Sequence, residues 1–295
     1  MPDKNYIITT DSTTDLPPDF YSRHRLPYLS VDYILDDIRY DGVNLSLSPE
    51  QFYSRMRAGA MPLTQQANPD TSKRFFEHYL KDGHDILHIA FSSGLSGTYQ
   101  SACIARDDLA ERYPDRKLIV IDSLCASLGE GLLVSEALRR QQAGLSIDEV
   151  ARWVTDRRLN LMHDVVADDL FHLQRGGRVS RTAAVVGTAL GIKPMIYLDN
   201  SGKLTPYGKV RGKKAALALL ADHLARKIDR NCDCNVIYIC HSDALGDAQE
   251  LEQMIRAKQV GIDNFLIYYI GPTIGAHTGI GTVSVFYFAA NRDPK

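Results

Sequence analysis

Short apolar runs alternate with longer segments of helical periodicity along the first half of the chain. Three of the runs have the length of buried strands, at residues 6–10, 86–91 and 118–121. The other elements expected here are strands at 28–35 and 38–40, helices capped by Ser48 and Ser146 that run to 57 and about 158, and helices from 70 or 71, at 95–108 and at 129–142. Such alternation of strands and helices predicts a parallel sheet with helices on both faces.

The second half has a different pattern. Expected strands at 194–198 and 203–210 flank Asp199-Asn200-Ser201-Gly202, which is a strong signal for a β-hairpin. The remaining expected elements are helices at 165–174, 182–190, 213–228 and 247–258 and strands at 236–240, 265–270 and 282–288. We therefore expect an α/β protein of two domains. Residues 1–160 would form an N-terminal α/β domain with a parallel sheet, and residues 161–295 a C-terminal α+β domain with a mixed sheet.

The composition limits what the protein binds. Of the 295 residues, 44% are hydrophobic and 24% charged, as in soluble globular proteins, and the formal net charge is -2. This balance argues against nucleic acid as a partner. The N-terminus has no signal-peptide architecture, and no apolar run approaches the roughly 20 residues that span a bilayer. We expect a cytoplasmic protein without stable membrane insertion.

The cysteines form no disulfide framework. There are five, at Cys103, Cys125, Cys232, Cys234 and Cys240. The pair Cys232-Asp-Cys234 is a candidate for metal binding or redox cycling, but no second pair of cysteines or histidines nearby completes a metal site. The alternative is reduced thiols in a reducing cytoplasm. No metal site is expected, and the role of the pair stays open.

Polar side chains follow three of the predicted strands at the point where each strand ends. They are Asp11-Ser12, Ser92-Ser93 and Asp122-Ser123. Ligands of parallel α/β sheets bind beyond the carboxyl ends of the strands. If these strands are neighbours, the three clusters form one polar edge, and the sequence predicts a binding site there.

The richest of these clusters lies in residues 92–98, between a strand and a predicted helix. A helix start leaves unpaired N–H groups that favour a negative ligand. Gly94 and Gly97 would let a ligand approach the backbone, while Ser93 and Ser96 add hydroxyl donors. No lysine or arginine occurs between Ile86 and Cys103, so the segment predicts a neutral cradle for one carboxylate or phosphate. The alternative is an ordinary capped helix after a strand.

A second dense cluster spans residues 271–281, which carry four glycines around His277 between two predicted strands. A loop histidine there could donate a hydrogen bond to an acid or transfer a proton. The alternative is a surface or packed histidine. The segment is neither a P-loop nor a dinucleotide fingerprint. Four arginines, Arg175, Arg178, Arg181 and Arg211, are candidate partners for carboxylate or phosphate.

Five blocks of the sequence together resemble the DegV family of bacterial fatty-acid-binding proteins, the acyl carriers of fatty acid kinase. The blocks are residues 10–17 (TDSTTDLP), 92–102 (SSGLSGTYQSA), 175–180 (RGGRVS), 193–194 (KP) and 274–279 (IGAHTG). They occur in the family's order over nearly the whole chain. The family usually has Thr-Ser-Gln where this chain has Thr64-Gln65-Gln66, and Gly-Pro-Gly where it has Gly279-Ile280-Gly281.

The resemblance implies two α/β domains with a long-chain fatty acid in a tunnel between them. The carboxylate would meet the hydroxyls of Thr64 and Ser93 and nearby backbone N–H groups, with His277 close by. The full set of implied ligand-binding residues is Thr64, Ser93, Gly94, Ser96, Gly97, Arg178 and His277. A separate kinase subunit of the dihydroxyacetone-kinase-like type, which carries the ATP site, would phosphorylate the carboxyl group. Arg211 and His277 would be associated with that step, and the chain itself would need no cofactor.

The sequence leaves three function classes in competition. The first is a lipid-binding carrier that presents a fatty acid to a kinase and is not itself an enzyme. Burial of the acyl tail, worth about 0.8 kcal/mol per CH₂, could supply most of the affinity. The second is an acyl transferase or hydrolase using Ser93 with His277, although no Gly-x-Ser-x-Gly elbow is present. A transcription factor that senses an acyl ligand is disfavoured because no DNA-binding motif is found.

Overall fold

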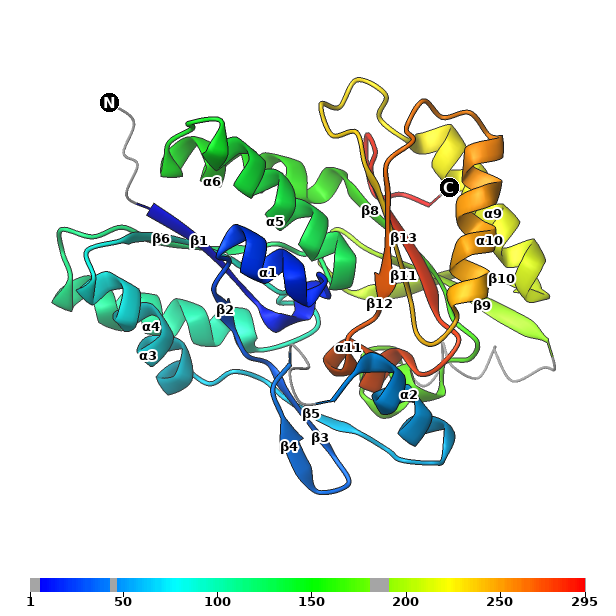
Figure 1. Ribbon diagram of the computed structural model, residues 1–295, viewed down its shortest axis with the longest axis horizontal. Coiled ribbons are helices and arrows are strands. Elements are labelled where there is room, and N and C mark those ends of the chain that lie inside the picture. Colours follow the sequence, from blue (N-terminus) through cyan, green and yellow to red (C-terminus); the bar gives the residue numbers. More distant parts are fainter. Residues whose placement is uncertain (1–5, 43–46, 181–190, 295) are drawn as a thin grey trace.

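The computed structural model describes residues 6–42, 47–180 and 191–294, and these form two lobes (Figure 1). Each lobe is built on its own sheet, of four strands in the first lobe and six in the second. A third sheet of three short strands lies at one end of the molecule (Figure 1). The helix expected at 182–190, and Arg181 before it, lie outside the described residues.

The first sheet is entirely parallel, as predicted. Its strands, in spatial order, are β2 (Tyr28–Leu29), β1 (Tyr6–Asp11), β6 (Asp85–Ala90) and β7 (Leu118–Asp122). Side chains alternate between its two faces, so that Ile86 and Leu87 enter different clusters of buried residues. The parallel arrangement places the carboxyl ends of β1, β6 and β7 at one edge of the sheet.

Helices cover both faces of this sheet (Figure 1). One face carries α1 (Pro18–His24), α5 (Ser127–Gln142) and α6 (Ile147–Arg157), and the other carries α3 (Pro69–Lys81) and α4 (Thr98–Arg112). Local sequence signals set the start of several helices. The Ser146 side chain accepts from the N–H of Glu149, whose carboxylate accepts from the Ser146 N–H, and Asn68 accepts from the Thr71 N–H at 2.9 Å.

The second sheet is mixed. Its strands, in spatial order, are β10 (Leu204–Arg211), β9 (Ile192–Leu198), β8 (Leu161–Val166), β13 (Val283–Phe288), β11 (Ile237–His241) and β12 (Phe265–Tyr269). All neighbouring pairs are antiparallel except β11 and β12. Helices α9 (Lys213–Lys227) and α10 (Leu245–Ala257) pack side by side on its outer face (Figure 1). The hairpin predicted around Asp199-Asn200-Ser201-Gly202 is confirmed as β9 and β10, and the helix predicted at 213–228 is confirmed as α9.

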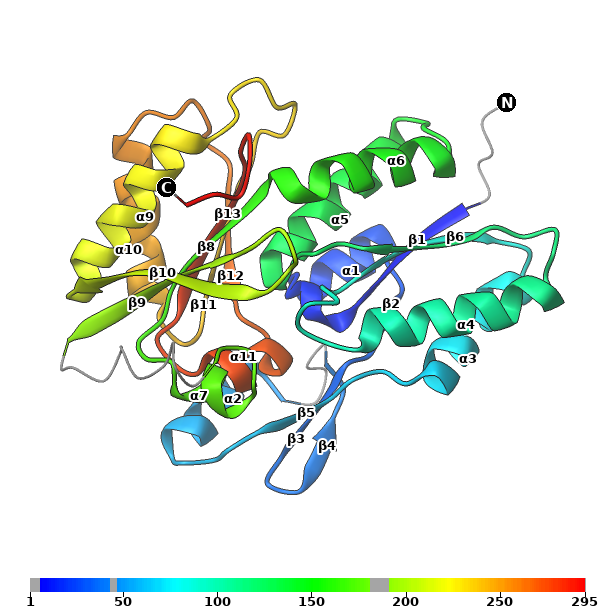
Figure 2. The same ribbon diagram turned by 180° about the vertical axis from the view of Figure 1, so that it is seen from behind.

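Helix α5 joins the two lobes. Its buried residues, among them Leu128 and Leu132, share one apolar cluster with Tyr238 and Phe286 of the second sheet. At the other end of the molecule, α2 (Pro49–Arg57), α7 (Phe171–Arg175) and α11 (Pro272–Thr278) gather near the small sheet of β4 (Ile38–Tyr40), β3 (Asp32–Leu35) and β5 (Leu63–Gln65) (Figure 2). Two short 3₁₀ turns, Ser12–Thr14 and Arg158–Asn160, complete the described elements.

Four sequence-based expectations were wrong. The segment expected as a helix at 165–174 contains the end of strand β8 and then the short helix α7, because Val165 and Val166 pair with β9 and β13. The glycine-rich segment around His277 contains helix α11 instead of only a loop. The expected strand 28–35 is broken between β2 and β3. The helix expected from 95 begins at Thr98, because residues 92–97 form turns first.

Within the described residues, no helix has both the length and the apolar character needed to cross a membrane.

Candidate functional site

A cavity of about 220 Å³ lies between the lobes. Its wall is largely apolar and comes mainly from the second sheet, from the segments that follow β1, β6 and β7, and from α11. The apolar lining consists of Val31, Phe91, Leu95, Ala126, Val165, Ala167, Leu173, Ile196, Leu198, Leu204, Ile270, Ile274 and Phe286. Most of these side chains also belong to clusters of buried apolar residues, two of which contain residues of both lobes. An apolar wall with a few convergent polar groups is typical of a small-molecule site.

Thr64 and His277 meet at this cavity. Strand β5 places Thr64 opposite Tyr33 of β3, and the last turn of α11 carries His277. Their side chains form a hydrogen bond of 2.9 Å between Thr64 Oγ1 and His277 Nε2, and both line the cavity. Gln66, which follows β5, also lines the cavity.

The Nδ1 edge of the His277 ring packs against Gly176. A methyl group on Gly176 would lie 2.1 Å from His277 Nδ1, so only glycine leaves room for the ring. Nδ1 is buried, and no polar atom of the described residues pairs with it. Burial, with Arg178, Arg175 and His172 nearby, lowers the pKa of His277 to about 4. His277 is therefore neutral at pH 7, with one ring nitrogen as a hydrogen-bond donor and the other as an acceptor.

Arg178 brings a positive charge to the same wall. Its guanidinium donates to the carbonyl oxygens of Leu95, at 3.1 Å, and Gly176. It forms no ion pair with any carboxylate of the described residues, and burial lowers its pKa. A half-buried guanidinium without a counterion favours an anionic ligand at the cavity.

The glycines of the predicted cradle are approached by other parts of the protein. A methyl group on Gly94 would lie 2.6 Å from the Gly202 carbonyl oxygen, and one on Gly97 would meet the Gln66 side chain at 2.6 Å. The Gly97 N–H itself donates to Gln66 Oε1 at 3.1 Å. Neither Gly94 nor Gly97 belongs to the cavity lining.

The serines of this segment divide in the same way. Ser96 lines the cavity, with its Oγ 2.9 Å from Thr98 Oγ1. Ser92 is buried and donates to the Gly202 carbonyl oxygen at 2.7 Å. Ser93 is exposed outside the cavity lining, and its N–H donates to Asp122 Oδ1 at 3.1 Å. Since His277 Nε2 is paired with Thr64, the Ser93–His277 contact that a serine hydrolase requires is not formed.

The predicted polar edge exists, and besides Asp11 it contains two buried carboxyl groups that the sequence reasoning missed, those of Asp15 and Glu130. Asp11 accepts from the Phe91 N–H at 2.8 Å, and Thr13 Oγ1 lies between Asp11 and Glu130. Asp15 accepts from Ser127 Oγ. Burial raises the pKa of all three carboxyls, that of Asp15 to about 8.

The edge touches the cavity through Thr13 and Ser127, which line it. The Thr13 hydroxyl donates a hydrogen bond to Glu130, and the Ser127 hydroxyl donates one to Asp15. The run of hydroxyl and acidic residues at 10–15 was the available signal, but its partners lie on α5, more than a hundred positions away.

The remaining candidates lie elsewhere. Arg211 is exposed at the end of β10, outside the cavity lining. Cys232 and Cys234 line a separate depression on the second lobe. Among the described residues, no group of three or more histidine, cysteine or acidic side chains could hold a metal ion.

The chain is similar to known proteins over nearly its whole length. The sequence model of the DegV family matches residues 5–290. A DegV domain-containing protein of Clostridium perfringens is 42% identical over 292 residues, which covers 99% of this chain and 100% of the relative.

Two solved structures have the same fold. A DegV family protein from Thermus thermophilus, described by its fatty acid binding, has a TM-score of 0.83 and 28% identity and covers 97% of this chain and 99% of its own. A fatty acid binding DegV family protein from Streptococcus agalactiae has a TM-score of 0.84 and 26% identity, with the same coverage of 97% and 99%.

Proposed function

This chain belongs to the DegV family, and from that premise we propose that it binds a long-chain fatty acid in the cavity between its lobes. The acyl tail lies against the apolar wall, and the carboxylate meets Thr64, Ser96, Arg178 and His277. The observation that carries the proposal is the composition of this one cavity. It combines a largely apolar wall with the Thr64–His277 pair and an arginine that no described carboxylate neutralises.

The energetics of such a ligand fit this wall. Each buried CH₂ group contributes about 0.8 kcal/mol, so the tail supplies most of the affinity. The polar groups then need only to position the carboxylate. Arg178 has already lost part of its hydration, so a carboxylate that approaches it gains a charge-assisted hydrogen bond at a small additional cost. Of the two serines, Ser96 is the one that we assign to the head group, because it lines the cavity.

We also propose that the bound carboxyl group is phosphorylated by a separate kinase subunit of the dihydroxyacetone-kinase-like type, which brings the ATP. The support is the resemblance of the sequence blocks together with the location of the polar residues. His277 lines the cavity, and Arg211 is exposed on the same lobe, where it would contact the phosphoryl donor on the partner. The chain then acts as a carrier that holds and presents the acid.

Extraction of the purified protein tests whether a fatty acid is bound. The purified protein is denatured and extracted with organic solvent, and the extract is examined by mass spectrometry. A fatty acid in amounts comparable to the protein is the expected result. Titration of delipidated protein with fatty acids follows, with Ser96→Ala expected to weaken binding and Ser93→Ala expected to leave it unchanged. An extract free of fatty acids, together with no binding by the delipidated protein, would reject the proposal.

The kinase step is tested separately. The loaded protein is mixed with ATP and a purified kinase of this type, and acyl phosphate is trapped with hydroxylamine as the hydroxamate. Arg211→Ala is expected to lower the rate of acyl phosphate formation while fatty-acid affinity stays the same. No hydroxamate with any such kinase would reject the carrier role and leave fatty-acid binding intact.

A further inference from the structure

Cys232 and Cys234 face one surface depression on the second lobe. They lie in the segment between α9 and β11, and both line a cavity of about 360 Å³ that shares no lining residue with the ligand cavity. The backbone bends at Cys232 and Asp233, and the Cys232 N–H donates to the Asp229 carbonyl oxygen at 3.1 Å. A bend brings the Cα atoms of two residues that are separated by one other residue toward the short separations that a disulfide requires. Cys232 is therefore accessible to a small reagent, and Cys234 lies beside it in the same depression.

The two thiols differ in environment. Cys232 is partly exposed, and the Arg157 guanidinium donates to its Sγ at 3.4 Å. A neighbouring guanidinium stabilises the thiolate, which is the reactive form of cysteine. Cys234 is buried, and burial, together with the nearby Glu136 carboxylate, raises the pKa of its thiol. Cys232 is thus the nucleophile of the pair, and Cys234 is a protonated thiol beside it.

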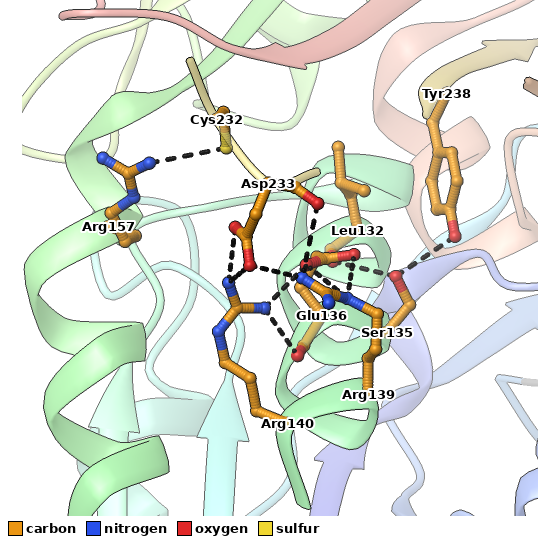
Figure 3. Close-up of polar contacts among 9 residues, drawn as sticks. All are labelled: Leu132, Ser135, Glu136, Arg139, Arg140, Arg157, Cys232, Asp233 and Tyr238. Atoms are coloured by element: carbon orange, nitrogen blue, oxygen red, sulfur yellow. Dashed lines mark hydrogen bonds and ion pairs between the residues drawn. The ribbon is translucent and has the colours of Figure 1, made fainter. Parts of the chain in front are cut away.

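The residue between them is held by the first lobe. The Arg140 guanidinium donates to both carboxylate oxygens of Asp233, at 2.7 and 2.8 Å, and Arg139 donates to Asp233 Oδ2 at 2.7 Å (Figure 3). Both arginines also bind Glu136 on the same helix, α5 (Figure 3). The Arg140 guanidinium lies 3.6 Å from the ring centroid of Trp153, which is the one tryptophan of the chain.

We propose that Cys232 and Cys234 form a redox modification site whose substrate is a hydroperoxide and whose product is a Cys232–Cys234 disulfide. The Cys232 thiolate attacks the hydroxyl oxygen of the hydroperoxide. The O–O bond breaks, an S–OH bond forms, and the alkoxide or hydroxide that leaves takes a proton from water. The Cys234 thiol then attacks the sulfenic sulfur. The S–S bond forms, the S–O bond breaks, and the leaving hydroxide takes the Cys234 proton to give water.

Closure of this small ring has a consequence for the contact between the lobes. The ring contains Asp233, so the backbone on both sides of Asp233 must turn when the sulfurs come together. The Asp233 carboxylate then leaves the Arg139 and Arg140 guanidinium groups. Because Arg140 is stacked on Trp153, this movement changes the surroundings of the indole. Oxidation at this site therefore changes the contacts of helix α5, which links the two lobes.

Peptide mapping tests the chemistry. The full-length protein is treated with hydrogen peroxide, alkylated, digested without reduction and analysed by mass spectrometry. The expected product is a Cys232–Cys234 peptide that has lost two hydrogen atoms and resists alkylation until dithiothreitol is added. The buried Cys103, Cys125 and Cys240 serve as internal references in the same sample. Oxidation of Cys232 no faster than that of these three would overturn the proposal.

Three variants separate the steps. In Cys234→Ser, Cys232 should stop at the sulfenic acid, which dimedone traps. Arg157→Gln should slow oxidation of Cys232 roughly three- to tenfold, while Arg157→Lys should restore most of the rate because it keeps the positive charge. Trp153 emission should change on oxidation of the wild-type protein and not of Cys234→Ser. A disulfide that forms without a change in Trp153 emission would overturn the link to Arg140, and equal rates in the two Arg157 variants would overturn the role of Arg157.

Discussion

Thr64 Oγ1 lies 2.9 Å from His277 Nε2, although 213 positions separate the two residues in the sequence. The contact joins the small sheet next to the first lobe to helix α11, which precedes the last strand of the second sheet. It closes one side of the apolar cavity with polar atoms. Two distant segments thus supply a single hydrogen-bonding group to the proposed carboxylate site.

Replacement of Thr64 by valine should weaken fatty-acid binding roughly tenfold, because one hydrogen bond to the charged head group is lost while the shape of the side chain is kept. Isothermal titration of delipidated protein measures the change. Thr155→Val is the matched control. Thr155 lies on α6 and does not line the cavity, and its Oγ1 donates to the Ala151 carbonyl oxygen at 2.9 Å. Equal affinities of the two variants would show that Thr64 does not contact the ligand.

Gly176→Ala should displace the His277 ring, since the new methyl group would lie 2.1 Å from Nδ1. The backbone at Gly176 suits alanine, so the effect is purely one of space. We expect a loss of about 1–3 kcal/mol in the free energy of unfolding and roughly tenfold weaker binding of a fatty acid. Urea denaturation and titration measure the two quantities.

Gly246→Ala is the control for this substitution. Gly246 lies in α10, and a methyl group there would meet no atom within 4 Å. Alanine should therefore stabilise the protein by about 0.5–1 kcal/mol through its helix propensity and leave binding unchanged. If both glycine variants bind a fatty acid as the wild type does, the position of His277 has no effect on the head group.

Val165→Phe should reduce the longest acyl chain that the cavity accepts. Val165 is buried on β8 and lines the apolar wall, so a phenyl ring there takes space from the tail. In a series of saturated acids, the gain of about 0.8 kcal/mol per CH₂ should stop at a shorter chain than in the wild type. Ile104→Phe, on the exposed face of α4, adds comparable bulk outside the cavity and should not alter the series. A series unchanged by Val165→Phe would place the tail elsewhere.

The elements that were predicted correctly are those whose signals are local. The alternation of apolar runs and helical segments predicted the parallel sheet with β1, β6 and β7, and Asp199-Asn200-Ser201-Gly202 predicted the hairpin of β9 and β10. The polar ends of β1, β6 and β7 were predicted to lie together, and they do, because neighbouring parallel strands end at one edge.

The elements that were missed depend on contacts between distant segments. Residues 161–166 form a fully buried central strand, and a short apolar run of that kind cannot be distinguished from part of a helix by its period. A side chain at position 94 would clash with the β9–β10 hairpin, and one at position 97 would clash with Gln66. Neither contact can be recognised from the sequence around these glycines. The burial of Asp15 likewise depends on contacts with residues that are distant in the sequence, Ser127 and Gly271.

The raised pKa of Asp15 makes a prediction about stability. Burial raises the pKa of Asp15 in the folded state from its ordinary value of 3.8 to about 8. Between these values the folded state keeps a proton that the unfolded state releases, so the contribution of Asp15 to stability is lost as the pH rises through this range. Asp15→Asn removes this titration and fits the backbone, since the φ of 52° at this position is one that asparagine tolerates.

The free energies of unfolding of the wild type and of Asp15→Asn, measured with urea at about pH 5 and about pH 8, test this. The variant should gain on the order of 3 kcal/mol relative to the wild type between the two conditions, because each unit of pKa shift corresponds to about 1.4 kcal/mol. Other groups titrate in both proteins and cancel in the difference. Asp19→Asn on the exposed surface of α1 should show a small offset that is the same at both pH values. A pH-independent difference for Asp15→Asn as well would mean that Asp15 is ionised in the folded protein, with a solvated or paired carboxylate.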